Sequence, residues 1–176
     1  AGAVYPVTID PLIASQEAKL GLEITGDGAA IDNFGSSVAL AGDIALIGAP
    51  TDFTAFGNMV GSVYVFKRSG FGWSQQAKLT PGGGAGSGPG GFGVAVALSG
   101  DTALIGAYRD YNSSTTNNDS GSAYVFKRTG SSWSRQAKLT ASDAQAGSCF
   151  GLSVALSGDT ALVGAYRNED NVSGSV

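Results

Sequence analysis

Short runs of alternating apolar and polar residues, separated by glycine-containing turns, make up most of this chain. Residues 37–40 alternate and are followed by a Gly-Asp pair, and the apolar run 44–49 begins after a connection short enough for a β-hairpin. Residues 63–68 are rich in β-branched and aromatic side chains, and the more polar residues 73–79 are typical of an outer strand. No stretch has a convincing helical period, and glycine interrupts every candidate. The pattern therefore predicts an all-β fold.

The same four-strand pattern recurs along the chain. Phe34, Phe92 and Phe150 are each followed by glycine and lie 58 residues apart, and the Gly-Asp and Gly-Ala pairs keep this interval. Residues 62–70 return almost unchanged as residues 122–130, and each copy is followed by a tryptophan and the sequence Gln-Ala-Lys-Leu-Thr. A repeat of this length indicates tandem supersecondary units. We predict propeller-type, four-stranded antiparallel blades, of which 34–80 and 92–140 are complete.

The two ends of the chain match complementary halves of this unit. Residues 3–20 align without a gap with residues 62–79, which predicts the C-terminal half of a blade, and residues 150–176 match the N-terminal half. A single domain, 1–176, then holds about three blade equivalents, whereas closed propellers typically have four to eight. We expect either that chains complete the split blade between them, as a head-to-tail ring or filament, or that the sequence is a fragment of a longer six- or seven-bladed chain. The expected assembly edges are Val4, Tyr5, Val7, Ile9, Ala161, Leu162 and Val163.

The Phe34-Gly35 and Gly48-Ala49-Pro50 elements resemble the FG-GAP repeat, the unit of the integrin α-subunit propeller and of many secreted bacterial repeat proteins. Later copies keep Phe-Gly and Gly-Ala but carry Tyr108 and Tyr166 in place of the proline. The resemblance covers nearly the whole chain and implies a β-propeller fold and an extracellular or cell-surface location.

The family's calcium-binding members carry an Asp-x-Asp-x-Asp-Gly-type loop between the two elements. Here that loop holds a single carboxylate per repeat, from Asp43, Asp101 or Asp159, whereas calcium needs six to eight oxygen ligands. We therefore expect no cofactor and no calcium in the family's usual place. The three turn aspartates are expected to bond the local backbone instead.

The segments after each Gly-Ala pair vary while the strands repeat, and repeat folds often place such insertions on their binding face. Acidic residues there could ligate a cation or could be ordinary solvated loop residues: Asp52, Asp110, Asp119, Glu169 and Asp170. The same segments contain Asn-x-Ser glycosylation sequons at Asn112, Asn118 and Asn171. The loops predict an alternative function, adhesin- or lectin-like binding of a glycan or protein ligand.

Aromatic residues recur as well: Trp73 and Trp133, with Tyr64 and Tyr124, could form sugar platforms or pack between neighbouring blades. The lysine and arginine at 67–68 and 127–128 are expected to be solvated charges that flank a turn.

Composition argues against several classes of function. The net charge is −4 with no basic cluster, which argues against nucleic acid as a partner, and no apolar run approaches the ~20 residues of a membrane helix. Histidine is absent, so the commonest general base is missing. Cys149 lies in a sequence that imitates a nucleophile elbow, and residues 86–91 match a dinucleotide fingerprint, but a strand follows each where the motif requires a helix. We expect a non-enzymatic structural module that associates with itself.

Overall fold

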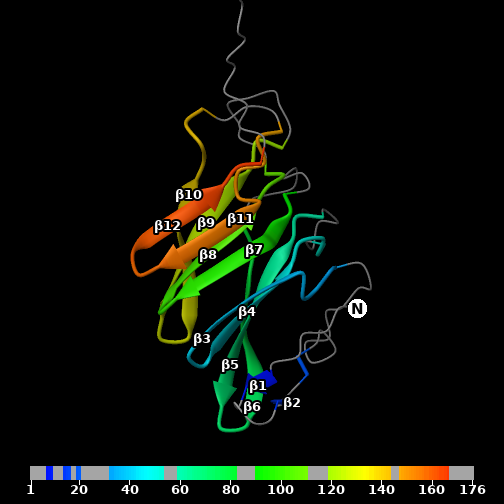
Figure 1. Ribbon diagram of the computed structural model, residues 1–176, viewed down its shortest axis with the longest axis vertical. Helices are drawn as coiled ribbons and strands as arrows, with labels where there is room; N and C mark the ends of the chain where they lie inside the picture. The colour runs from blue at the N-terminus through cyan, green and yellow to red at the C-terminus, as the bar shows by residue number, and fades with distance from the viewer. Residues whose placement is uncertain are drawn as a thin grey trace, which may run out of the picture.

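The computed structural model describes residues 7–9, 14–16, 19–20, 32–53, 59–82, 90–110, 119–143 and 147–166, and in this part of the chain all regular structure is β-strand (Figure 1). The predicted all-β class is confirmed. The strands are β1 (Val7–Ile9), β2 (Ala14–Gln16), β3 (Ser37–Ala41), β4 (Ile44–Ala49), β5 (Ser62–Ser69), β6 (Gly72–Leu79), β7 (Phe92–Ser99), β8 (Thr102–Ala107), β9 (Ser122–Thr129), β10 (Ser132–Leu139), β11 (Ser153–Ser157) and β12 (Thr160–Gly164).

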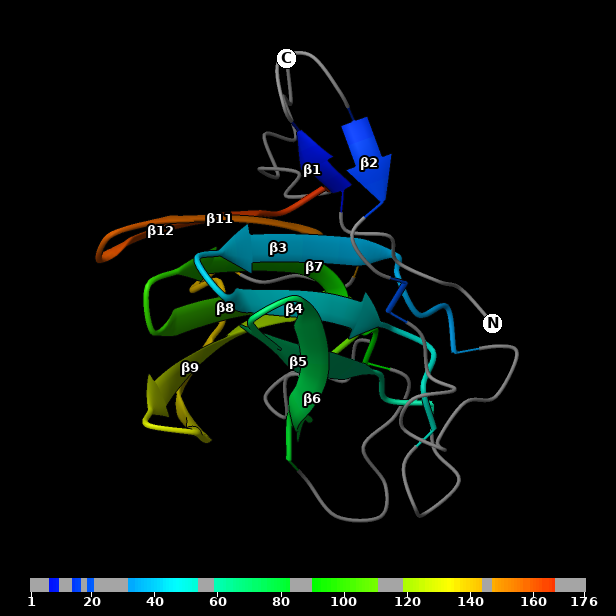
Figure 2. The same cartoon turned by 90° about the horizontal axis from the view of Figure 1, so that it is seen from below.

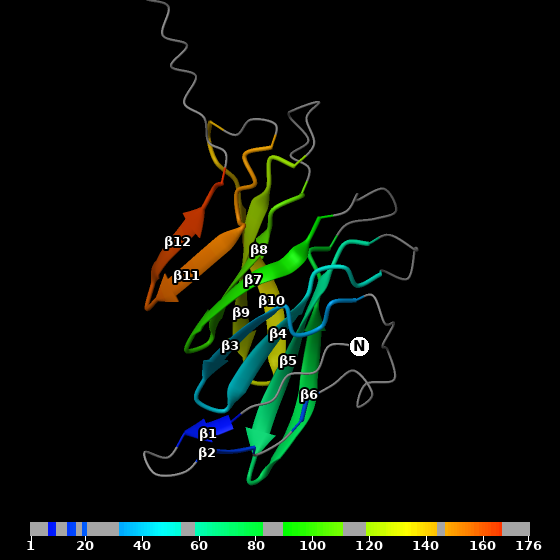
Figure 3. The same ribbon diagram turned by 45° about the vertical axis from the view of Figure 1, so that its right-hand side comes forward.

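The strands form antiparallel sheets in sequence order. One four-stranded sheet has the order β3-β4-β5-β6 and a second has the order β7-β8-β9-β10, while β11 and β12 form a two-stranded sheet, as do β1 and β2. The first strands of successive sheets lie next to one another, with β7 in contact with both β3 and β11 (Figure 2). The sheets follow one another along the molecule like propeller blades (Figure 3), so the predicted propeller-type architecture is confirmed.

Each first hairpin closes over a two-residue Gly-Asp loop. Gly42, Gly100 and Gly158 have φ values of 57°, 55° and 58°. This left-handed conformation costs glycine little and lets a two-residue connection follow the twist of the flanking strands. Glycine at this position therefore fixes the length and register of the hairpin in every repeat.

The core lies between consecutive sheets. Phe34 packs edge-to-face against Tyr64 and Phe66 of its own sheet, with centroids 5.5 and 6.3 Å apart. Phe92 makes the same contacts with Tyr124 and Phe126, at 5.4 and 6.1 Å. Such pairs contribute about 0.5–1.5 kcal/mol each beyond the burial of their area. In both four-stranded sheets the phenylalanine of the Phe-Gly element thus anchors one face of its sheet.

The glycines of the two sequence elements meet between neighbouring sheets. Gly93 packs directly on Gly48, and Gly151 packs directly on Gly106. No side chain fits at either contact, and Ser37 Oγ donates a hydrogen bond of 2.7 Å to the Gly93 carbonyl at the first of them. The recurrence of Phe-Gly and Gly-Ala in the sequence therefore follows from close packing of one sheet on the next.

The N-terminal hairpin, β1 and β2, has the same register as the outer two strands of a four-stranded sheet. Val7 pairs with Gln16 as Phe66 pairs with Gln75, and these positions are equivalent in the alignment of residues 3–20 with 62–79. Leu20, which aligns with Leu79, is buried in a cluster with Phe34, Ile47, Ala49, Tyr64 and Phe66. Leu79 is buried against the corresponding residues of the next sheet, so the two leucines make equivalent contacts.

Candidate functional site

The end of the sheets that carries the segments after Gly-Ala, here called the loop end, contains a repeated buried charge cluster. Tyr64 donates a hydrogen bond of 2.9 Å to Asp52 Oδ2, and Lys78 Nζ lies 3.0 Å from the same oxygen. The Asp52 side chain is almost completely buried, and the Lys78 ammonium group lies 5.1 Å from the centroid of the Tyr64 ring. One carboxylate oxygen therefore serves both a phenol and an ammonium group.

The second sheet has the same cluster. Tyr124 donates a hydrogen bond to Asp110 Oδ2, and Lys138 Nζ lies 3.1 Å from that oxygen. Arg135 adds a second cation, 6.0 Å from the centroid of the Tyr124 ring. Burial raises the pKa of both Tyr64 and Tyr124 far above the usual range, and the acceptor carboxylates raise it further. Both phenols stay protonated and hold the start of the following loop in place.

The sequence contains a signal for these clusters that the predictions above do not include. Asp52, Tyr64 and Lys78 each recur in the next repeat, as Asp110, Tyr124 and Lys138. A buried aspartate that recurs with a lysine and a tyrosine predicts an ion pair with a hydrogen-bond donor. Two of the five candidate cation ligands, Asp52 and Asp110, are thus already partnered by lysine. Among the described residues, no group of three or more His, Cys, Asp or Glu side chains gathers.

A small hollow lies between the two complete sheets at the loop end. Its volume is about 140 Å³, and its lining includes Pro50, Thr51, Met59, Tyr108 and Arg109. The Arg109 guanidinium lies 5.1 Å from the centroid of the Tyr108 ring, and the Arg109 amide donates a 3.1 Å hydrogen bond to the Gly90 carbonyl. The hollow is therefore lined by an arginine that lies over an aromatic ring.

The opposite end of the sheets, here called the turn end, carries the Gly-Asp loops. Asp43 Oδ1 accepts a hydrogen bond from Arg68 Nε at 3.1 Å, and Asp101 Oδ1 accepts one from Arg128 Nε at 2.7 Å. Asp43 and Asp101 thus pair with arginine side chains, which the sequence did not predict, and Arg68 and Arg128 are partly exposed and ion-paired at the same time. Each arginine lies on the strand beside the turn, where its side chain reaches the carboxylate.

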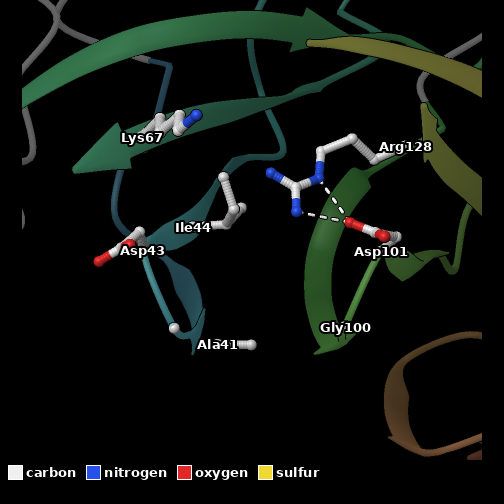
Figure 4. Close-up of a pocket in the computed structure, with 8 residues that line it drawn as sticks. Ala41, Asp43, Ile44, Lys67, Gly100, Asp101 and Arg128 are labelled. Carbon is white, nitrogen blue, oxygen red and sulfur yellow. Dashed lines mark hydrogen bonds and ion pairs between the residues drawn. The ribbon is translucent and has the colours of Figure 1, made fainter. Parts of the chain in front are cut away.

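An open groove of about 610 Å³ separates the two turns at this end (Figure 4). Asp43 and Lys67 line one wall, and Asp101 and Arg128 line the other. In Figure 4 the Arg128 side chain is joined to Asp101 by two contacts and extends toward Ile44 on the facing wall. Acidic and basic groups are mixed here, so the groove has no single charge to select a ligand.

The aromatic residues lie in contacts between and beside the sheets. Trp133 Nε1 donates a 3.1 Å hydrogen bond to Gln76 of the preceding sheet and packs against the core between the two sheets. Trp73 packs against the cluster around Tyr64, and Arg68 lies 6.0 Å from its ring centroid. These contacts favour the packing interpretation over the sugar-platform interpretation.

The remaining predicted site residues lie either on the strands and turns described above or outside the described residues. Asp119 and Cys149 are adjacent, because the Cys149 amide donates a 3.1 Å hydrogen bond to the Asp119 carbonyl. The following lie outside the described residues: the sequons at Asn112, Asn118 and Asn171, the acids Glu169 and Asp170, and the edge residues Val4 and Tyr5. Val7 and Ile9 lie on β1, and Ala161, Leu162 and Val163 lie on β12.

Among the described residues, β12 pairs with β11 and its other edge is open, whereas its equivalents β4 and β8 each pair on both sides. Leu162 is 70% exposed, but Leu46 and Leu104, at the same position of the repeat, are fully buried. A hollow of about 300 Å³ lies over this hairpin, lined by Ser153, Val154, Ala155, Leu162, Val163 and Gly164. Unpaired strand edges with apolar neighbours are sites where further strands add.

Comparison with known families gives three matches along the chain. The model of the FG-GAP repeat matches residues 14–66, 73–126 and 133–176. The second match begins in β6 and ends in β9, so this sequence unit joins the outer strand of one sheet to the first three strands of the next. No curated protein matches the chain. The described residues contain no helix that is long and apolar enough to cross a membrane.

Proposed function

Because the chain belongs to the FG-GAP repeat family, we propose that it is a non-enzymatic structural module that associates with itself by adding strands at the open edge of β12. The observation that carries this proposal is the exposure of Leu162 on a strand whose equivalents are central and buried. A β-propeller-like module with such an edge gains both backbone hydrogen bonds and apolar burial when the missing strands are supplied.

The direction of the backbone groups on β12 supports strand addition. The Gly164 carbonyl accepts a 2.9 Å hydrogen bond from the Gly151 amide, so Gly164 faces the β11 side of its sheet. Because backbone groups alternate in direction along an antiparallel strand, Ala161 and Val163 direct their N–H and C=O groups toward the open edge. Their equivalents on β4, Ala45 and Ile47, pair there with Phe66 and Tyr64.

The N-terminal hairpin is the natural complement. β1 and β2 have the register of β5 and β6, the strands that complete a sheet beside β4. Transferred to β12, the pairing of Ala45 with Phe66 places Val7 of one chain opposite Ala161 of another. The proposed association therefore repeats a pairing that the protein already makes twice within one chain.

Proline at the edge tests this role. Ala161→Pro removes an N–H that points to the open edge and leaves the bonds between β11 and β12 in place, since proline is tolerated at edge strands. We expect the wild-type chain to sediment as an oligomer and the variant as a folded monomer with an unchanged circular dichroism spectrum. Leu162→Pro is the matched control, because the backbone N–H of Leu162 points toward β11. Its removal should disrupt the hairpin of β11 and β12 itself. An Ala161→Pro chain that still associates would refute the proposal.

A second candidate function is ligand binding at the loop end, of an adhesin- or lectin-like kind. The hollow lined by Tyr108 and Arg109 supports it, because an arginine that lies over an aromatic ring suits the polar groups of a sugar or the carboxylates of an acidic peptide. The test is a screen of glycans and acidic peptides with wild type and with Arg109→Ala. Binding that is lost in the variant would support this function, and a ligand bound equally by both would exclude this hollow.

An extracellular location belongs to the same proposal, since FG-GAP repeats are typically extracellular. The sequence supports the non-enzymatic part, because it contains no histidine and one cysteine. Secretion into the medium by the native source, followed by intact-mass analysis, tests the location and at the same time detects sugar on the three sequons. Retention of all the protein inside the cell would contradict it.

A further inference from the structure

Two opposite faces of the described structure carry apolar residues that are buried wherever the same position has a neighbouring sheet. On β3, Val38 is 57% exposed and Leu40 is 64% exposed. Their equivalents on β7 are Val96, which is buried between the first two sheets, and Leu98, which packs against the same cluster. On the other side, Leu162 of β12 is exposed where Leu46 and Leu104 are buried. At an internal boundary, a face like that of β3 packs against a face like that of β12. Here both faces are exposed, so each could cover the other.

We infer that these faces are the two halves of one head-to-tail interface, in which β3 of a second copy of this chain packs against β11 and β12. This inference rests on the proposed function and adds to it a second contact surface, the β3 face, and the residues that meet there. The boundary between the first two sheets gives the geometry, since β7 contacts both β3 and β4 there, and β11 makes the same kind of contact with β7 and β8.

The glycines supply a second, independent part of the interface. Gly48 meets Gly93 and Gly106 meets Gly151, so the next contact in the series joins Gly164 to the glycine of a following Phe-Gly element. Gly35 is the glycine of such an element at the first sheet, and its φ of 93° matches the 90° of Gly93 and the 92° of Gly151. Gly35 of a second copy therefore has the backbone conformation that packing on Gly164 requires.

A specific hydrogen bond follows from the same register. Ser37 Oγ donates to the Gly93 carbonyl across the first boundary at 2.7 Å. The residue that corresponds to Ser37 in the third repeat is Ser153, which is exposed and lies beside Gly164 in the hollow over β11 and β12. In the assembled interface Ser153 Oγ donates to the Gly35 carbonyl of the second copy. The hollow is then filled by Val38, as the internal boundary is filled by Val96.

A heterologous interface makes a prediction that an interface between two identical patches does not. A β3-face variant, Val38→Asp with Leu40→Asp, keeps an intact β12 face. A β12-face variant, Leu162→Asp, keeps an intact β3 face. In a solution of either variant alone, an intact face never meets an intact partner face. In a mixture, the intact β12 face of one variant can bind the intact β3 face of the other.

The experiment measures the mass of the 176-residue chain by sedimentation velocity for wild type, each variant and their equimolar mixture. All three substituted residues are exposed, so the variants should fold, and unchanged thermal unfolding checks this. We expect wild type to associate, each variant to run at the chain mass of 17.5 kDa, and the mixture to give a complex of one copy of each. Phe71→Asp, at the almost fully exposed tip between β5 and β6, is the matched control and should associate as wild type does.

The outcomes separate this inference from the proposed function. If Leu162→Asp is monomeric while the β3-face variant associates normally, association at β12 stands but its partner is not the β3 face, and the inference is wrong. A mixture that stays monomeric also overturns the inference. If both variants associate like wild type, the inference is wrong, and the Ala161→Pro variant decides separately whether the proposed function stands.

A variant at the glycine contact gives a second check. A Cβ on Gly164 would meet the Ser153 Oγ at 2.3 Å, a flexible side-chain atom, so Gly164→Ala is tolerated within one chain. In the assembled interface the Cβ that Gly164→Ala adds would collide with the backbone of Gly35 of the second copy. A Cβ on Gly48 or Gly106 would collide in the same way with the backbone of Gly93 or Gly151. We expect Gly164→Ala to fold normally and to weaken association at least tenfold, and normal association of this variant would exclude the Gly35 contact.

Discussion

A Cβ atom placed on Gly48 would lie 2.0 Å from the carbonyl oxygen of Gly93, which belongs to the next sheet. Backbone cannot yield as a flexible side chain can, so the two sheets would have to separate. We predict that Gly48→Ala lowers the free energy of unfolding by about 1–3 kcal/mol, the usual cost of overpacking. Gly72→Ala is the control: Gly72 is also a strand glycine, but the nearest atom to its Cβ is 3.9 Å away. Urea unfolding of both variants measures the difference, and equal effects would contradict the packing account.

The buried cluster around Asp52 should matter more than the ion pair at the turn end. Asp52→Asn removes the charge that faces Lys78 Nζ at 3.0 Å, and charged hydrogen bonds contribute about 1.5–3 kcal/mol. Asp43→Asn breaks a pair in which both side chains are well exposed, and such pairs contribute about 0–1 kcal/mol. Chemical unfolding at neutral pH compares the two. A larger loss for Asp43→Asn would contradict the assignment of the cluster as a support for the loop end.

Alkaline pH tests the two buried phenols. Their folded-state pKa values are raised by burial, so their contribution to stability is complete below the unfolded tyrosine pKa of about 10. Above that pH the unfolded chain ionises while the folded chain does not, and stability falls as pH rises toward the folded pKa. We predict a shallower decline between pH 9 and 11 for Tyr64→Phe with Tyr124→Phe than for wild type. Parallel curves would show that the phenols are not the source.

Cys149 has a left-handed backbone conformation, which suits the asparagine and glycine at the equivalent positions of the other repeats better than it suits cysteine. Its φ is 52°, and the equivalent residues are Asn33 at 52° and Gly91 at 58°. A left-handed conformation costs most L-residues about 1–2 kcal/mol, and only glycine, asparagine and aspartate adopt it readily. We predict that Cys149→Gly raises the melting temperature, whereas Cys149→Ala, which only removes the thiol, does not. A gain with alanine would point to the thiol instead of the backbone.

The sequence predicted the fold well because the repeat reports directly on packing. The recurring Phe-Gly and Gly-Ala pairs mark the residues that meet between sheets, and the Gly-Asp pairs mark two-residue hairpin loops. The alignment of residues 3–20 with 62–79 anticipated a hairpin whose register matches that of β5 and β6. These features are local, or they repeat, and either property makes them visible in a single sequence.

The side-chain partners were harder to predict. The sequence gives no sign of the partner of Asp43, because Arg68 lies 25 residues away and reaches it only when β4 and β5 pair. The cluster of Asp52, Tyr64 and Lys78 brings three strands or loops to one point at the loop end. Contacts of this kind depend on sheet register, which the composition of any one segment does not contain.

The mass of the particle in solution tests the central claim most directly. Light scattering coupled to size exclusion, run over a hundredfold range of protein concentration, gives this mass for the 176-residue chain. Association at β12 predicts a mass that is a multiple of the 17.5 kDa chain and that falls toward one chain on dilution. A particle that stays at 17.5 kDa at every concentration would contradict the claim that this module associates with itself.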